Sequence, residues 1–218
     1  DGIRDVERSR GLGDVYKRQI NNLALINDQI KSKFGLVKNL NIIAVSKTFP
    51  MSEINPLIEN GQIHFGENKV QEAIDKWSDI KKLNKNLKLH MIGKLQTNKV
   101  KYVVPLFDYI HSLDNIKLAE KIASEQIKKN RNLKIFIQVN IGNEPQKAGL
   151  NISDLKNFYE KCTQELNLNI IGLMCLPPQY GLAKNYFNEM VELKKTINVE
   201  DLSMGMSEDY LEAVACGT

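Results

Sequence analysis

The sequence predicts an α/β protein, a (β/α)8 or TIM barrel that stops before its eighth strand. Short apolar runs rich in β-branched residues alternate with longer segments whose apolar residues recur at helical spacing. Such alternation is typical of a parallel sheet with helical crossovers, either an open doubly wound sheet or a closed barrel. Seven strand–helix units and an opening helix fit into residues 20–218, and eight units close a barrel in about 250 residues. The count therefore favours the barrel, with one strand still to come after Thr218.

Each element follows from the period of its apolar residues. The opening helix runs from Ile20 to Phe34, and Gly35 ends it. The segment "NIIAVS" that comes next is short and continuously apolar, which is typical of a strand covered on both faces. The predicted strands are 41–46, 62–65, 87–92, 108–111, 133–139, 169–173 and 201–204. The helices predicted to follow them are 52–60, 67–82, 95–104, 115–129, 152–165, 182–197 and 208–216.

The composition is that of an ordinary globular protein, with 42% hydrophobic and 26% charged residues. The formal net charge is +4 and the basic residues are scattered, so we expect no nucleic-acid partner. No apolar run approaches the roughly 20 residues of a membrane span, so we expect no membrane partner either. The cysteines, Cys162, Cys175 and Cys216, are odd in number and far apart, which favours a reducing compartment. We therefore expect a cytoplasmic protein.

Residues 1–19 differ in composition from the rest of the chain. Four of the five arginines lie in this segment, whereas every asparagine follows it. From Ile20 onward the chain is rich in Asn, Lys and Ile, and the preceding "DVYKRQ" resembles the translation of a sequencing-library adaptor. We therefore expect residues 1–19 to be a non-native leader, with a natural disordered tail as the alternative, and residues 20–218 to form the barrel.

Lys47 is the candidate nucleophile. In a barrel of this kind the chemistry lies at the carboxyl ends of the strands, and the first predicted strand leads directly into Lys47. Its apolar flanks would desolvate the side chain, and desolvation favours the uncharged amine that can attack an aldehyde. A lysine whose charged end simply reaches solvent at the strand end is the other interpretation.

The segment "SMGMSED", between the last predicted strand and the last predicted helix, is a candidate phosphate site. Ser207 is placed to cap the helix, with Glu208 and Asp209 in its first turn. A helix start of this type binds phosphate through backbone amides and a hydroxyl, and the loops after strands seven and eight commonly do so in this fold. A plain helix cap is the other interpretation. An aldehyde held by Lys47 and a phosphate held near Ser207 would match pyridoxal 5′-phosphate.

Seven motifs in chain order carry a more specific resemblance. They are "AVSKT", "HFGENKVQE", "HMIGKLQTNK", "VN" followed by "QKAGL", "GLMCLPP", "YFNEM" and "LSMGMSEDYLEAVACGT". Residues 20–218 thereby resemble the pyridoxal phosphate homeostasis protein family, single-domain relatives of the alanine racemase N-terminal barrel. The resemblance implies that Lys47 carries the cofactor as a Schiff base, that Asn68 lies beside the site, and that Ser207 and Thr218 lie in the phosphate-binding region. The chain departs from the family pattern by stopping at Thr218, before a Val-Arg-x-Gly strand that completes the phosphate site.

The resemblance implies a protein that stores pyridoxal phosphate and passes it to pyridoxal-phosphate-dependent apo-enzymes. An amino-acid racemase is the alternative, and it needs two bases on opposite faces of the substrate. In the two-domain racemases that the barrel resembles, one base comes from a second domain for which no length remains here. A barrel that binds another phosphorylated metabolite without covalent chemistry is a third possibility.

Two further groups of residues are given no role. His64, His90 and His111 fall on or near three different strands, but their spacings match no metal-ligand motif, so we expect no metal site. Cys175 lies at a strand end and has no base nearby in the sequence.

Overall fold

The computed structural model describes the backbone of residues 2–179 and 181–218, and the side chains of residues 17–179 and 181–218. Within these residues seven strands form one parallel sheet, in sequence order from β1 to β7. The strands are β1 (Ala44–Val45), β2 (His64–Glu67), β3 (Lys88–Met91), β4 (Tyr109–Leu113), β5 (Lys134–Val139), β6 (Ile170–Cys175) and β7 (Asp201–Ser203). The predicted alternation and parallel pairing are confirmed.

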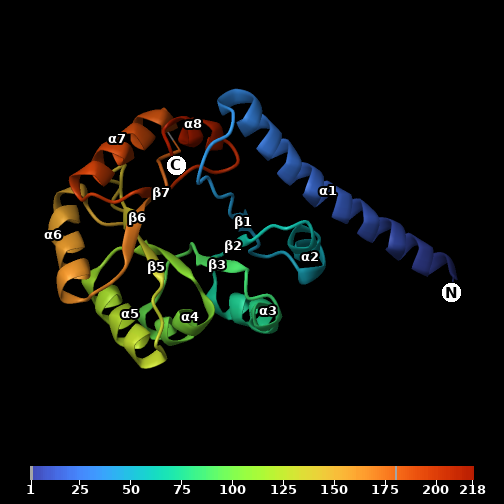
Figure 1. Ribbon diagram of the computed structural model, residues 1–218, viewed down its shortest axis with the longest axis horizontal. Coiled ribbons are helices and arrows are strands. Elements are labelled where there is room, and N and C mark those ends of the chain that lie inside the picture. Colours follow the sequence, from blue (N-terminus) through green and yellow to red (C-terminus); the bar gives the residue numbers. More distant parts are fainter. Residues whose placement is uncertain (1, 180) are drawn as a thin grey trace.

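The helices lie outside the sheet, which curls into an open ring with β1 and β7 at its two edges (Figure 1). They are α1 (Gly2–Phe34), α2 (Met51–Glu59), α3 (Val70–Leu83), α4 (Val100–Leu106), α5 (Ile116–Lys129), α6 (Leu155–Glu160), α7 (Ala183–Thr196) and α8 (Tyr210–Ala215). Short 3-10 turns, η1 (Thr97–Lys99) and η2 (Ile152–Asp154), precede α4 and α6. A π-helical turn, η3 (Lys161–Glu165), follows α6, so the single helix predicted over 152–165 consists of three segments.

The first strand differs most from its prediction. The sequence predicts a strand over 41–46 that is covered on both faces, but β1 contains only Ala44 and Val45, and Val45 is exposed. The physical reason is its position, because β1 pairs with β2 alone and lies at the edge of the sheet. The prediction of a buried first strand is therefore wrong for this structure.

The two faces of the sheet have different chemistry. The face toward the helices is apolar, and Leu89, Met91 and Ile110 are almost completely buried there in the main core. Side chains alternate between faces along a strand, so His90 and His111 point to the inside of the ring, where their rings lie 5.1 Å apart. The helix-facing side stabilises the fold, and the inner side is polar.

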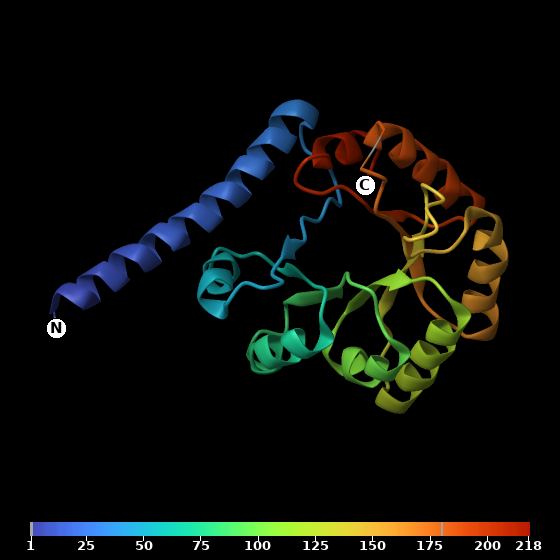
Figure 2. The same ribbon diagram turned by 180° about the vertical axis from the view of Figure 1, so that it is seen from behind.

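The amino-terminal part of helix α1 extends away from the ring, whereas its middle contacts α2, where the side chain of Gln19 donates to Glu53, and its carboxyl-terminal part approaches α8 (Figures 1 and 2). There the hydroxyl of Tyr210 hydrogen-bonds to the side chain of Gln29. The composition break before Ile20 falls within α1, and the side chains of residues 1–16 lie outside the described residues. The non-native leader stays a prediction. None of the helices within the described residues combines the length and apolar character that a membrane span requires.

Candidate functional site

The structure places the predicted site residues at one end of the sheet. Because all seven strands are parallel, Lys47 after β1, Asn68 after β2 and Ser207 after β7 lie at the same rim. Thr218 comes to this rim from the end of the chain, with its hydroxyl 3.1 Å from the carbonyl oxygen of Leu202 and 3.2 Å from that of Met204. Ser207 and Thr218 therefore lie in one region, beside the edge strand β7.

The side chain of Lys47 is exposed, contrary to the desolvated position that its apolar flanks predict. Lys47 begins a turn directly after the edge strand β1, where no further strand of the described residues covers it. The amine is therefore open to a ligand from outside, and apolar surroundings do not desolvate it in this structure.

A buried polar network lies beneath this turn. Ser46 is buried, its backbone N–H donates to the carbonyl oxygen of Gly66 at 2.9 Å, and its hydroxyl donates to Oε1 of Glu67 at 2.8 Å. The same Oε1 accepts the indole N–H of Trp77 at 2.9 Å and lies 2.8 Å from Nζ of Lys76. Glu67 and Trp77 are both fully buried, so the turn is attached to the apolar core through charged and polar groups.

The helix α3 also contacts the turn directly. Nζ of Lys76 donates to the carbonyl oxygen of Ser46 at 2.7 Å and lies 3.4 Å from that of Phe49. Oε1 of Glu72 accepts the backbone N–H of Thr48 at 2.6 Å and lies 2.9 Å from Nζ of Lys76. The hydrogen bond from Lys76 lowers the pKa of the Glu72 carboxyl. The backbone groups that α3 contacts, those of Ser46, Thr48 and Phe49, lie on both sides of Lys47 in the chain.

Asn68 is held at the rim by a close backbone contact. A Cβ atom added to Gly93 would lie 2.4 Å from the carbonyl oxygen of Asn68 and 2.7 Å from its Cα, so only glycine fits beside it. The side-chain oxygen Oδ1 of Asn68 is buried and has no hydrogen-bond partner among the described residues, and the same holds for Oε2 of Glu67. Buried acceptors of this kind are uncommon and are available to a ligand that brings a donor.

Ser207 is not the cap of α8. The helix begins at Tyr210, its N-cap position is Asp209, and Ser207 is exposed. A carboxylate oxygen of Asp209 accepts the backbone N–H of Met206 at 2.5 Å and closes the turn before the helix. The helix therefore starts two residues later than predicted, and no side chain at its N-cap position hydrogen-bonds to its first turn.

Inside the ring, three histidines form a hydrogen-bonded chain that the sequence does not reveal. Nδ1 of His64 lies 2.9 Å from Nε2 of His90, and Nδ1 of His90 lies 2.8 Å from Nε2 of His111. Nδ1 of His111 lies 2.7 Å from the hydroxyl of Ser203, at the end of β7. Tyr109 stacks on His90 and Phe136 stacks on His111, with ring centroids 4.1 and 4.4 Å apart.

Burial keeps these imidazoles neutral. It lowers the pKa of His111 to about 3 and that of His90 well below its usual range, with smaller contributions to His90 from the neighbouring histidines. The rings are arranged in series and do not surround one point. Among the side chains of residues 17–179 and 181–218, no group of three or more histidines, cysteines or acidic residues is arranged to hold a metal ion. The sequence feature that could have indicated the chain of hydrogen-bonded histidines is the presence of one histidine on each of three consecutive strands.

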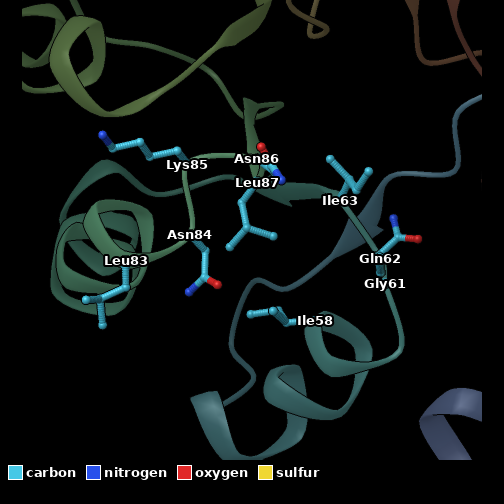
Figure 3. Close-up of a pocket in the computed structure, with 9 residues that line it drawn as sticks. All are labelled: Ile58, Gly61, Gln62, Ile63, Leu83, Asn84, Lys85, Asn86 and Leu87. Atoms are coloured by element: carbon cyan, nitrogen blue, oxygen red, sulfur yellow. The ribbon is translucent and has the colours of Figure 1, made fainter.

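A cavity lies at the opposite end of the sheet from the candidate site. It has a volume of about 570 Å³, and Figure 3 shows Ile58 from α2, with Leu83 and Leu87, among the residues that line it. The other lining residues come from the segments that enter β2 and β3. This cavity contains none of the predicted site residues and is not a candidate cofactor site.

Comparison with known proteins identifies the family. Residues 22–216 match the family model described as alanine racemase, N-terminal domain. The pyridoxal phosphate homeostasis protein of Aquifex aeolicus is 36% identical over 185 residues, which cover 81% of this chain and 80% of that protein. Its namesake from Haemophilus influenzae is 33% identical over 211 residues, which cover 90% and 89% of the two chains.

A solved structure agrees with these relatives. PipY of Synechococcus elongatus, with pyridoxal phosphate bound, superposes with a TM-score of 0.79 at 35% identity, and the match covers 94% of each chain. The sheet, the rim and the sequence identity lead to the same family. The chain belongs to the alanine racemase N-terminal domain family and, within it, to the pyridoxal phosphate homeostasis proteins.

Proposed function

We propose that this protein binds pyridoxal 5′-phosphate covalently through Lys47 and acts in the storage and delivery of this cofactor. The observation that supports this function is an exposed primary amine on a turn that is tied to the core from both sides. The relatives named above support the choice of ligand, since they are homeostasis proteins for this cofactor and PipY has it bound.

The rim residues fit the two ends of the cofactor. When bound, pyridoxal phosphate supplies an aldehyde that condenses with a primary amine and releases water. Lys47 provides the amine, and Ser207 and Thr218 provide hydroxyl groups beside β7 for the phosphate. Asn68 provides a buried oxygen that lacks a donor. We assign Lys47, Asn68, Ser207 and Thr218 to the cofactor site on this basis.

The proposal also includes the fold and the cellular location. We propose that the sheet is a (β/α)8 barrel without its eighth strand, because the strand order runs from β1 to β7 without interruption and leaves β1 and β7 each with one unpaired edge. We place the protein in the cytoplasm, where its free thiols, Cys162, Cys175 and Cys216, would stay reduced. Its recipients would be apo-enzymes that depend on pyridoxal phosphate.

Two titratable groups on the strands favour a carrier over a racemase. A racemase needs two bases that exchange protons near neutral pH. Burial lowers the pKa of His111 to about 3, which makes its imidazole a weak base. Burial also raises the pKa of the Cys175 thiol, at the end of β6, to about 12, so that thiolate is scarce. Neither side chain is suited to take a proton from a substrate.

Borohydride trapping tests the covalent site. We expect the chain mixed with pyridoxal phosphate and reduced with borohydride to carry the pyridoxyl group on Lys47, as read by peptide mass spectrometry. Lys47→Ala should lose the label, whereas Lys69→Ala, an exposed lysine beside Asn68 at the same rim, should keep it. Equal labelling of Lys47→Ala and the unmodified chain would refute the assignment. Loss of optical rotation from L-alanine at enzyme-like turnover would favour the racemase.

A further inference from the structure

We propose that Lys76 is a positioning residue for Lys47, and that together with Glu67 and Glu72 it fixes the backbone turn that presents the Lys47 amine. This role rests on the proposed covalent function of Lys47. It concerns a side chain of α3 that lies far from Lys47 in the sequence and contacts the backbone around it.

The geometry at Nζ of Lys76 matches the three donors of an ammonium group. Three acceptors lie within 2.9 Å, namely Oε1 of Glu67, Oε1 of Glu72 and the carbonyl oxygen of Ser46. The carbonyl oxygen of Phe49 lies further away, at 3.4 Å. An ammonium donates three hydrogen bonds and accepts none. Here they go to the carbonyl oxygens of Ser46 and Phe49 and to Oε1 of Glu72, and the carboxylate of Glu67 adds a close ion pair.

Burial makes these contacts strong. The side chain of Lys76 is 13% exposed and that of Glu67 is not exposed at all. Charge-assisted hydrogen bonds are stronger than neutral ones, and they gain further in surroundings of low dielectric constant. Since Glu67 is also held by the indole of Trp77, the ammonium occupies a fixed point relative to the core.

The turn needs these contacts because its conformation is unfavourable by itself. Thr48 has a φ of 65°, in the left-handed region that β-branched residues rarely adopt. Its backbone N–H donates to Glu72, and its hydroxyl donates to the carbonyl oxygen of Lys47 at 2.6 Å. A strained residue of this kind persists where its surroundings hold it, and here α3 does so.

The consequence concerns the Lys47 amine. Its side chain is exposed, so only its backbone is ordered by the fold. A backbone fixed on both sides reduces the entropy that is lost when the amine binds an aldehyde. Lys76 thus contributes to capture of the cofactor without touching it.

The test compares two positions on α3. Lys76→Met combined with Glu67→Gln removes both charges, so that no buried charge is left unpaired. Lys82→Met is the matched control, because Lys82 is 75% exposed and pairs only with exposed Asp79 among the described residues. Far-ultraviolet circular dichroism reports whether each variant is folded, because Trp77 contacts the substituted Glu67 and its fluorescence would change without unfolding.

Two measurements separate positioning from a general loss of structure. Without cofactor, amide hydrogen exchange of residues 46–50 should become about tenfold faster in the double variant, while the amides of β4 and β5 stay protected. With cofactor, the rate of borohydride-trapped labelling at Lys47 should fall about tenfold, and the visible circular dichroism of the bound cofactor should weaken. Lys82→Met should match the unmodified chain in both.

Each outcome decides the proposal. A folded double variant with unchanged exchange at residues 46–50 and an unchanged labelling rate would overturn the role of Lys76. If the unmodified chain is not labelled at Lys47, the proposed function fails, and the exchange data still decide whether Lys76 fixes the turn. If the double variant does not fold, Glu72→Ala replaces it, since this change removes the acceptor of the Thr48 N–H and one partner of Lys76.

Discussion

At the scale of single residues, two glycines at the rim differ in what surrounds them. A Cβ on Gly93 would meet backbone atoms of Asn68 at 2.4 and 2.7 Å, and backbone atoms can give way only if a strand end moves. A Cβ on Gly66 would meet Cγ2 of Ile43 at 3.0 Å and Cδ1 of Ile92 at 3.1 Å, which are ends of flexible side chains. The rim therefore tolerates a methyl group at Gly66 better than at Gly93.

Gly93→Ala should therefore be the more damaging of the two changes. We expect it to lower the free energy of unfolding by about 1–3 kcal/mol, the usual cost of overpacking, because Asn68 has to move. It should also weaken cofactor binding, since Asn68 belongs to the proposed site. Urea unfolding followed by Trp77 fluorescence measures the first effect, with Gly66→Ala as the control. Equal losses of unfolding free energy in Gly93→Ala and Gly66→Ala would contradict the expected difference in packing around the two glycines.

The position of Lys47 and Asn68 at the rim could be predicted from the sequence, but the surroundings of these residues could not. Lys47 and Asn68 lie in short motifs next to predicted strands, and the structure places both at the rim. The exposure of Lys47 depends on β1 being an edge strand, and Ser207 lies in the turn before α8, outside the helix that it was expected to cap. The contact between Lys76 and Ser46 joins residues 30 positions apart, which no local pattern encodes.

At the scale of elements, Asp108 connects three consecutive strand–helix units at the end of the sheet opposite the site. Its Oδ2 accepts the backbone N–H of Leu89 in β3 at 2.8 Å and forms a close ion pair with Lys81 of α3. Its Oδ1 lies 3.7 Å from Arg131, which precedes β5. Burial lowers the pKa of Lys81, and the pairing with Asp108 opposes that shift.

We expect Asp108→Asn to lower the free energy of unfolding by about 1–3 kcal/mol, because a partly buried ammonium loses its partner. Asp79→Asn is the control, since its pair with Lys82 is exposed on the same helix and should contribute much less. Thermal or urea unfolding of both variants gives the comparison. A loss in Asp79→Asn as large as that in Asp108→Asn would count against the role of Asp108.

The periodicity of apolar residues is sufficient to predict the order and type of the elements, since each helix buries one face and each central strand contains buried apolar residues on its helix-facing side. The periodicity does not reveal local irregularities within an element. The predicted helix over 152–165 ends in a π-helical turn in which the N–H of Leu166 donates to the carbonyl oxygen of Lys161 at 3.2 Å. An α-helical turn and a π-helical turn bury nearly the same apolar residues, so the sequence does not indicate where the α-helix gives way to the π-helical turn.

At the scale of the whole molecule, the neutral histidines make stability depend on pH. A histidine in the unfolded chain titrates near 6.5, whereas burial lowers the pKa of His111 to about 3 in the folded protein. Between these values the unfolded chain binds more protons than the folded protein, so acid favours unfolding. The contribution of His111 is complete above pH 6.5 and is lost progressively as the pH falls toward 3.

The expected loss between pH 7 and pH 5 is about 2 kcal/mol for one fully buried imidazole. Urea unfolding at pH 7, 6 and 5 measures it, in a range above the titration of most carboxylates. His111→Gln should remove about that share of the pH dependence, while His90 keeps its own. Stability that stays constant from pH 7 to pH 5 would show that the imidazoles are not buried as described.

The series from His64 to Ser203 also restricts where protons can be. A neutral imidazole donates at one nitrogen and accepts at the other, so the direction of any one hydrogen bond sets the direction of all the rest. Only two tautomeric patterns satisfy the whole series, and they differ in whether the hydroxyl of Ser203 gives or receives a hydrogen. The orientation of a hydroxyl at the carboxyl end of β7 is therefore correlated with the tautomer of His64 on β2, at the other end of the series.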